Sequence, residues 1–167
     1  LSGCPEMAGL RADCYRFEAL ADLAEASWAR QKQTPVRPHL ERAVTAARRA
    51  TTAYSNDEKG WRDLARALLL LAEAQWPESN AAQLIEGLHA VDKALANAAG
   101  LSEAYALRGG LLLLQTRSAG NAAEQRVLLE KAQAAFAQAV AMNPRLKEVY
   151  AERIAAMNVL SMHLPPR

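Results

Sequence analysis

Apolar residues recur every three or four positions along most of the chain, which is the spacing of one face of an amphipathic helix. Helices are therefore expected at about 11–31, 38–54 and 58–75, from about 80 to between 97 and 100, and at about 102–116, 122–142 and 144–162. The residues predicted to turn the first helix toward the core are Leu10, Cys14, Phe17, Ala21, Ala24 and Trp28. The chain thus predicts a series of helices joined by short connections.

Residues that begin or end helices separate these stretches. Pro38 suits the first turn of the second helix, and Pro77 and Pro144 follow the third and sixth. Asn121 can cap the sixth helix with its side-chain oxygen, and Ser79 or Asn80 can cap the fourth in the same way.

Composition selects the fold class. The chain has 37 alanines but only 14 valine, isoleucine and threonine residues together. Alanine is the strongest helix former, whereas β-branched residues favour strands. We therefore expect an all-α protein, and small side chains also allow its helices to approach closely.

Three aromatic residues recur at nearly constant spacing. Trp61, Tyr105 and Tyr150 lie 44 and 45 positions apart. A small residue precedes each of them by 18 positions, namely Ala43, Gly87 and Ala132. Such a period indicates stacked helical repeats.

The third of these units resembles a tetratricopeptide repeat. The positions that carry the resemblance are Tyr105, Arg108, Gly109, Leu112, Ala132, Phe136, Ala139 and Pro144. A standard repeat of this family has about 34 residues. Here the extra length falls between the two helices, at residues 117–125, so the unit is similar to a long-loop variant.

The resemblance implies a right-handed α-solenoid of about three helix-turn-helix repeats with a C-terminal capping helix. Its expected parts are a loop or the tail of a truncated repeat (1–10), repeat 1 (11–57), repeat 2 (58–101), repeat 3 (102–146), the capping helix (147–162) and a tail (163–167). HEAT or armadillo repeats, at about 40–47 residues, are the alternative. A looser similarity links the chain to the C-terminal regions of some bacterial serine/threonine kinases.

The tetratricopeptide resemblance also implies a concave groove lined by the first helix of each repeat. The groove residues it implies are Tyr15, Asp22, Lys59, Arg62, Arg66, Leu69, Glu103, Leu113 and Asn158, beside small residues such as Ala106, Gly110, Ala151 and Ala155. Lys59, Arg62 and Arg66 share one helix face and favour an acidic group on a partner. The alternative is that these arginines only pair with Asp22 and Glu103 on flanking helices.

Candidate chemistry is sparse. None of His39, His89 and His163 has further ligands at a convincing sequence spacing, so neither a metal nor another cofactor is expected. No nucleophile–base set and no phosphate-binding loop can be assembled, so we do not expect an enzyme. A net charge of +2 without a clustered basic stretch argues against nucleic acid as a partner.

Compartment and partners follow from the remaining features. The leucine runs are too short to span a bilayer, and no signal peptide is apparent, so we expect no membrane insertion. Cys14 is expected to be a buried thiol; whether it pairs with Cys4 stays open, and a cytoplasmic location is favoured over a periplasmic one.

The expected function is a protein-protein interaction module that binds a peptide or helix. The alternatives are the regulatory domain of a kinase whose catalytic domain lies outside this chain, and a self-assembling scaffold.

Overall fold

The computed structural model describes residues 8–78 and 81–163, and all regular secondary structure in these two ranges is helical. The helices are α1 (Ala8–Gln31), α2 (Arg37–Ala53), α3 (Glu58–Ala74), α4 (Ala81–Asn97), α5 (Ser102–Thr116), α6 (Ala122–Met142), α7 (Leu146–Val149) and α8 (Ala151–His163). The all-α prediction is therefore confirmed. The expected caps at residues 79–80, Cys4 and the tail 164–167 lie outside the described residues.

Two of the predicted helix boundaries are wrong. The first helix includes Ala8, three residues before its predicted start and inside the segment expected to be a loop or the tail of a truncated repeat. The last predicted helix, 144–162, is two helices, because Tyr150 leaves the helical conformation at φ −108° and ψ 18°. Its ring is buried, with its centroid 6.1 Å from that of Phe136. The break therefore accompanies the insertion of an aromatic ring into the core.

The face of α1 expected to be buried is the exposed one. The residues that α1 buries are Ala12, Arg16, Ala19, Leu23, Ala26 and Ala29. On the opposite face Phe17 is 65% exposed and Trp28 is 61% exposed, while Cys14 is half-buried rather than buried. The alanines of the buried face let the neighbouring helix backbones come close, which larger side chains would prevent. The largest apolar side chains of α1, Phe17 and Trp28, are therefore on its surface and not in the core.

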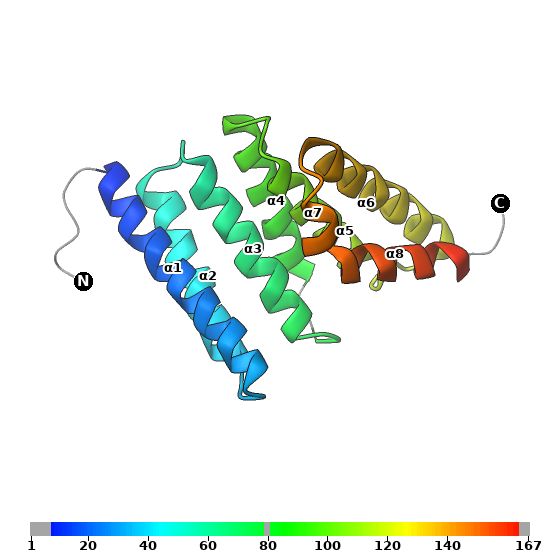
Figure 1. The fold of residues 1–167 in the computed structure, drawn as a ribbon, viewed down its shortest axis with the longest axis horizontal. Coiled ribbons are helices and arrows are strands. Elements are labelled where there is room, and N and C mark those ends of the chain that lie inside the picture. The colour runs from blue at the N-terminus through cyan, green and yellow to red at the C-terminus, as the bar shows by residue number, and fades with distance from the viewer. Residues whose placement is uncertain (1–7, 79–80, 164–167) are drawn as a thin grey trace. The chain divides into compact units, whose positions relative to one another are not determined.

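The chain divides into two compact units, residues 1–99 and 100–167, called unit 1 and unit 2 below. Unit 1 contains two helical hairpins, in which α1 packs on α2 and α3 packs on α4. The hairpins are joined through contacts of α2 and α1 with α3, and Figure 1 shows these helices side by side. The buried side chains of unit 1 are mostly leucine and alanine, including Leu40, Leu68 and Leu84.

Polar contacts also hold unit 1 together. Asp57 caps α3, because its carboxylate accepts hydrogen bonds from the backbone N–H groups of Lys59 and Gly60 at 3.1 and 3.0 Å. Arg48 of α2 donates two hydrogen bonds to Glu86 of α4, at 2.7 and 2.6 Å. This bonding raises the pKa of Arg48 above its ordinary value. The fork-like pairing ties the second helices of the two hairpins together.

Unit 2 is built on the contact between α5 and α6, with α8 packed against both. Asn121 caps α6, as expected: its side chain accepts a hydrogen bond from the backbone N–H of Glu124 at 2.9 Å. A methyl group placed on Gly109 of α5 would lie 2.8 Å from Phe136 Cδ2 of α6. Only glycine therefore allows this approach of α5 to the buried ring.

No helix in residues 8–78 and 81–163 has an apolar stretch long enough to cross a membrane.

Gly109→Ala is expected to destabilise the protein by about 1–3 kcal/mol, the usual cost of forcing atoms into a packed core. Urea unfolding followed by circular dichroism measures this free energy. Gly9→Ala is the matched control, because Gly9 also lies in a helix and nothing would lie within 4 Å of the added methyl group. Equal stability of the two variants would show that the close approach at Phe136 does not constrain unit 2.

Candidate functional site

An open groove of about 640 Å³ runs between α1 and α2 in unit 1. Its lining residues come from both helices and are Glu18, Ala21, Asp22, Glu25, Pro38, Glu41, Arg42, Thr45, Ala46 and Arg49. Four of them carry carboxylates and two carry guanidinium groups. The helical spacing of three and four residues brings these side chains of α1 to a single face opposite α2. Below, this surface is called the α1–α2 groove.

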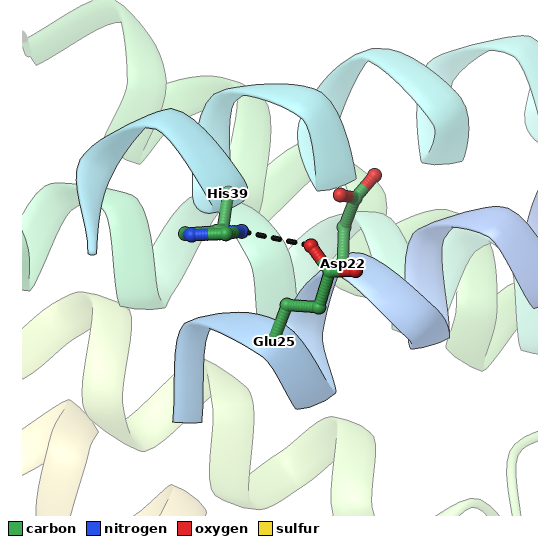
Figure 2. A group of neighbouring side chains, drawn as sticks. All are labelled: Asp22, Glu25 and His39. Carbon is green, nitrogen blue, oxygen red and sulfur yellow. Dashed lines mark hydrogen bonds and ion pairs between the residues drawn. The ribbon is translucent and has the colours of Figure 1, made fainter. Parts of the chain in front are cut away.

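Three metal-ligand side chains converge at the end of the groove near the α1–α2 turn. Figure 2 shows Asp22 and Glu25 on α1 and His39 on α2, and their candidate ligand atoms all lie within 4.8 Å of one another. His39 Nδ1 lies 2.9 Å from Glu25 Oε2. The Asp22 side chain is only 12% exposed, whereas that of Glu25 is 58% exposed. The cluster is thus anchored in the protein on one side and open to solvent on the other.

Arg42 reaches every member of this cluster. Its Nε donates to Asp22 Oδ1 at 2.8 Å, and its Nη2 donates to Glu25 Oε2 at 2.9 Å. The same Nη2 lies 2.9 Å from His39 Nδ1. Because an imidazole nitrogen carries either a proton or a lone pair, Nδ1 accepts from Arg42 or donates to Glu25, but not both at once. The guanidinium is the cation around which these groups are arranged.

The cluster can hold a divalent metal ion only where Arg42 withdraws. We therefore expect Arg42→Ala to bind Zn²⁺ more tightly than the wild-type protein, because two carboxylates and one imidazole then lose their cation. Isothermal titration calorimetry with Zn²⁺ measures the two affinities. Arg42→Ala/His39→Ala is the control for binding at the carboxylates alone. Equal Zn²⁺ affinities of the wild type and Arg42→Ala would show that the cluster is not poised for a metal.

Tyr15 and Asp22, the two predicted binding residues of α1, both make contacts to α2. The guanidinium carbon of Arg49 lies 4.0 Å from the centroid of the Tyr15 ring, a cation–π arrangement. Asp22 pairs with Arg42, so its ion pair runs to α2 and not to the α3 arginines suggested by the sequence. The two residues thus belong to the hairpin α1–α2.

The predicted binding residues of α3 differ in how far their side chains are exposed. Lys59 is exposed, and Arg66 is half-buried. The Arg62 side chain is 19% exposed and donates two hydrogen bonds to Asp63 Oδ1, at 2.9 and 2.7 Å. Leu69 is only 1% exposed, because α3 is packed on several sides, so the expectation that it lines an open groove is wrong.

The predicted residues of unit 2 include a second such error. Leu113 is 3% exposed and belongs to the interior, since four consecutive leucines of α5 are buried. Glu103 is half-buried in the first turn of α5, and Asn158 is exposed on α8. Among these three, only Glu103 and Asn158 have side chains that a partner can reach.

A buried carboxylate explains why Arg62 is engaged within the protein. Asp63 of α3 has no exposed side-chain surface, and Arg16 of α1 donates to its Oδ2 at 3.3 Å. Arg16 also pairs with Asp13 at 2.7 Å and lies 3.6 Å from Asp57. Two arginines therefore neutralise one buried charge, and one of the two links α1 to α3.

Arg16→Met should destabilise unit 1 by about 1–3 kcal/mol, because the buried Oδ2 of Asp63 loses its donor while Arg62 still neutralises the charge through Oδ1. Denaturant unfolding measures the change. Arg37→Met is the matched control: Arg37 pairs with Glu41 one turn away on an exposed surface, and its loss should leave stability unchanged. A similar small effect of both substitutions would contradict the structural role given to Arg16.

Sequence reasoning did not identify the cluster of Asp22, Glu25 and His39. Each helix carries its pair at a spacing of three residues, Asp22 with Glu25 and His39 with Arg42. A search for such pairs on either side of a short turn would have found them.

Comparison of the chain with protein-family models, with curated protein sequences and with solved structures finds no match. The tetratricopeptide resemblance therefore stays a prediction.

Proposed function

We propose that this protein is an interaction module of the helical-repeat type, without catalytic turnover, and that it binds a peptide or helix of another protein in the α1–α2 groove. The observation that supports this function is the groove itself, an open surface with charged side chains at regular intervals along two helices. The stacking of two hairpins in unit 1 agrees with a repeat array. A right-handed solenoid of three repeats and a capping helix is part of the proposal.

The charge of the groove favours a partner with basic side chains. Carboxylates outnumber guanidinium groups among the lining residues. Both arginines are already engaged, Arg42 with Asp22 and Glu25, and Arg49 with the Tyr15 ring and, at 3.6 Å, with Glu18. Arg37, outside the lining, pairs with Glu41, so three arginines serve four carboxylates, and a lysine or arginine of the partner balances the remaining charge.

The ion pairs already in the groove do not prevent this exchange. The exposed pair of Glu25 with Arg42 contributes only about 0–1 kcal/mol, so a ligand cation can replace Arg42 at Glu25 at small cost. Among the described residues, Glu18 Oε2 is a buried carboxylate oxygen with no hydrogen-bond donor. A donor from the partner satisfies it when the Arg49 side chain moves aside.

This proposal revises the partner expected from the sequence. The acidic partner was inferred from Lys59, Arg62 and Arg66, but Arg62 is engaged with the buried carboxylate of Asp63. An acidic peptide on the α3 face is therefore the second candidate, carried by exposed Lys59. The kinase regulatory domain remains an alternative setting for the same binding function.

The test is a selection of peptides from a random displayed library on the immobilised wild-type protein. We expect the enriched peptides to be rich in lysine and arginine, and to bind more weakly as salt rises, because exposed charges are screened. We expect Glu25→Lys/Glu41→Lys to lose at least a tenfold factor in affinity, measured by fluorescence anisotropy, which corresponds to about 1.4 kcal/mol.

Two further variants separate the possible surfaces. Glu148→Lys/Glu152→Lys makes the same charge change on exposed positions of α7 and α8 and should bind as the wild type does. Lys59→Glu/Arg66→Glu tests the α3 face. Enrichment of acidic peptides that only the last variant fails to bind would overturn the groove and support the α3 face instead. Peptides that bind all variants equally would refute both surfaces.

A further inference from the structure

Helix α1 carries an apolar stripe on the face opposite its buried residues. The stripe, called the outer stripe below, consists of Leu10, Cys14, Phe17, Ala21, Ala24 and Trp28. Leu10, Phe17 and Trp28 are 48%, 65% and 61% exposed. Because α1 also buries an alanine-rich face against unit 1, it is apolar on two opposite sides. A helix of that kind is usually covered on both sides.

We propose that the outer stripe is covered by the α1 helix of a second copy of this chain, packed antiparallel about a two-fold axis that crosses the stripe at the level of residue 19 along the helix. A two-fold interface places the same surface of both copies against itself, so the stripe has to be complementary to itself. Its residue sizes and its flanking charges both have this property. The proposal goes beyond peptide binding, although Ala21 of the stripe and the flanking Glu25 also line the α1–α2 groove.

The order of large and small residues fits an antiparallel pair. About this two-fold axis, Phe17 lies opposite Ala21 of the second copy, and Cys14 lies opposite Ala24. Leu10 at one end lies opposite Trp28 at the other. Phe17 then faces an alanine, which is the alternation that dense packing requires, and Trp28 faces the smaller Leu10. A parallel pair would place Phe17 on Phe17 and leave the alanines facing each other across a gap.

The charges beside the stripe point to the same arrangement. Arg11 and Glu25 are exposed and flank the stripe on the side of α2. In the antiparallel pair Arg11 of each copy approaches Glu25 of the other and adds a second cation to a carboxylate that already pairs with Arg42. Glu18, on the same flank near the axis, approaches Glu18 of the other copy, and Arg49 offsets its charge. In a parallel pair Arg11 would approach Arg11, and Glu25 would approach Glu25. Charge complementarity of this kind fixes orientation more than affinity.

The length of the outer stripe limits the area that the dimer can bury, and therefore its expected affinity. A helix of 24 residues is about 36 Å long, so one helix pair offers less than the roughly 800 Å² per partner of a standard stable interface. The dimer should therefore be reversible, with a dissociation constant on the order of micromolar.

Sedimentation velocity over a micromolar concentration series tests the dimer. We expect the wild type to shift from monomer to dimer as concentration rises, and Phe17→Glu to weaken dimerisation at least tenfold. Ile85→Glu is the matched control, because Ile85 is an apolar residue of α4 with 63% exposure, and it should dimerise as the wild type does. A wild type that stays monomeric throughout, or a dimer that Phe17→Glu leaves intact, would overturn the proposal.

Disulfide cross-linking tests the orientation. In the Cys4→Ser background, Ala24→Cys places a second thiol opposite Cys14 of the other copy, and mild oxidation should give a covalent dimer on a non-reducing gel. The Cys4→Ser protein alone should stay uncross-linked, because its two Cys14 residues are about ten positions out of register. Cross-linking of Cys4→Ser alone, or none with Ala24→Cys, would contradict the antiparallel pair.

Discussion

The orientation of α1 about its own axis depends on one buried carboxylate. Asp63 of α3 has no exposed side-chain surface, and Arg16 of α1 extends to it from the core face of its helix. A buried charge without a partner is costly, so α1 is held with Arg16 turned inward. Since successive residues of a helix are about 100° apart, this choice also determines where every other side chain of α1 points.

Two different surfaces of α1 follow from that single orientation. Residues on one flank of the core face, including Asp22 and Glu25, turn toward α2 and form the charged α1–α2 groove with it. Residues opposite the core, including Phe17 and Trp28, turn outward as the outer stripe. The polar surface suits a charged peptide, whereas the apolar one suits another helix. One orientation of α1 therefore gives it a charged flank beside α2 and an apolar outer face.

The packing of unit 2 depends on the close fit of side chains, whereas the orientation of α1 in unit 1 depends on a buried ion pair. Gly109 has no side chain, so α5 comes close enough to α6 for Phe136 to fill the space between them. The Tyr150 ring adds to the same cluster and interrupts the last helix where it does so. The sequence indicated that small side chains let the helices approach closely, but the break at Tyr150 was not predicted.

The sequence by itself determined the helices, because alanine content, spacing of apolar residues and capping residues such as Asn121 act within a few positions of the chain. It did not determine which face of α1 is buried, since both faces are apolar and sequence spacing ranked the one with larger side chains first. Only the tertiary structure decided that, by burying Asp63 beside Arg16 and packing alanines closely. It also brought His39 to Asp22 and Glu25, because contacts across a turn depend on how two helices pack and not on either helix alone.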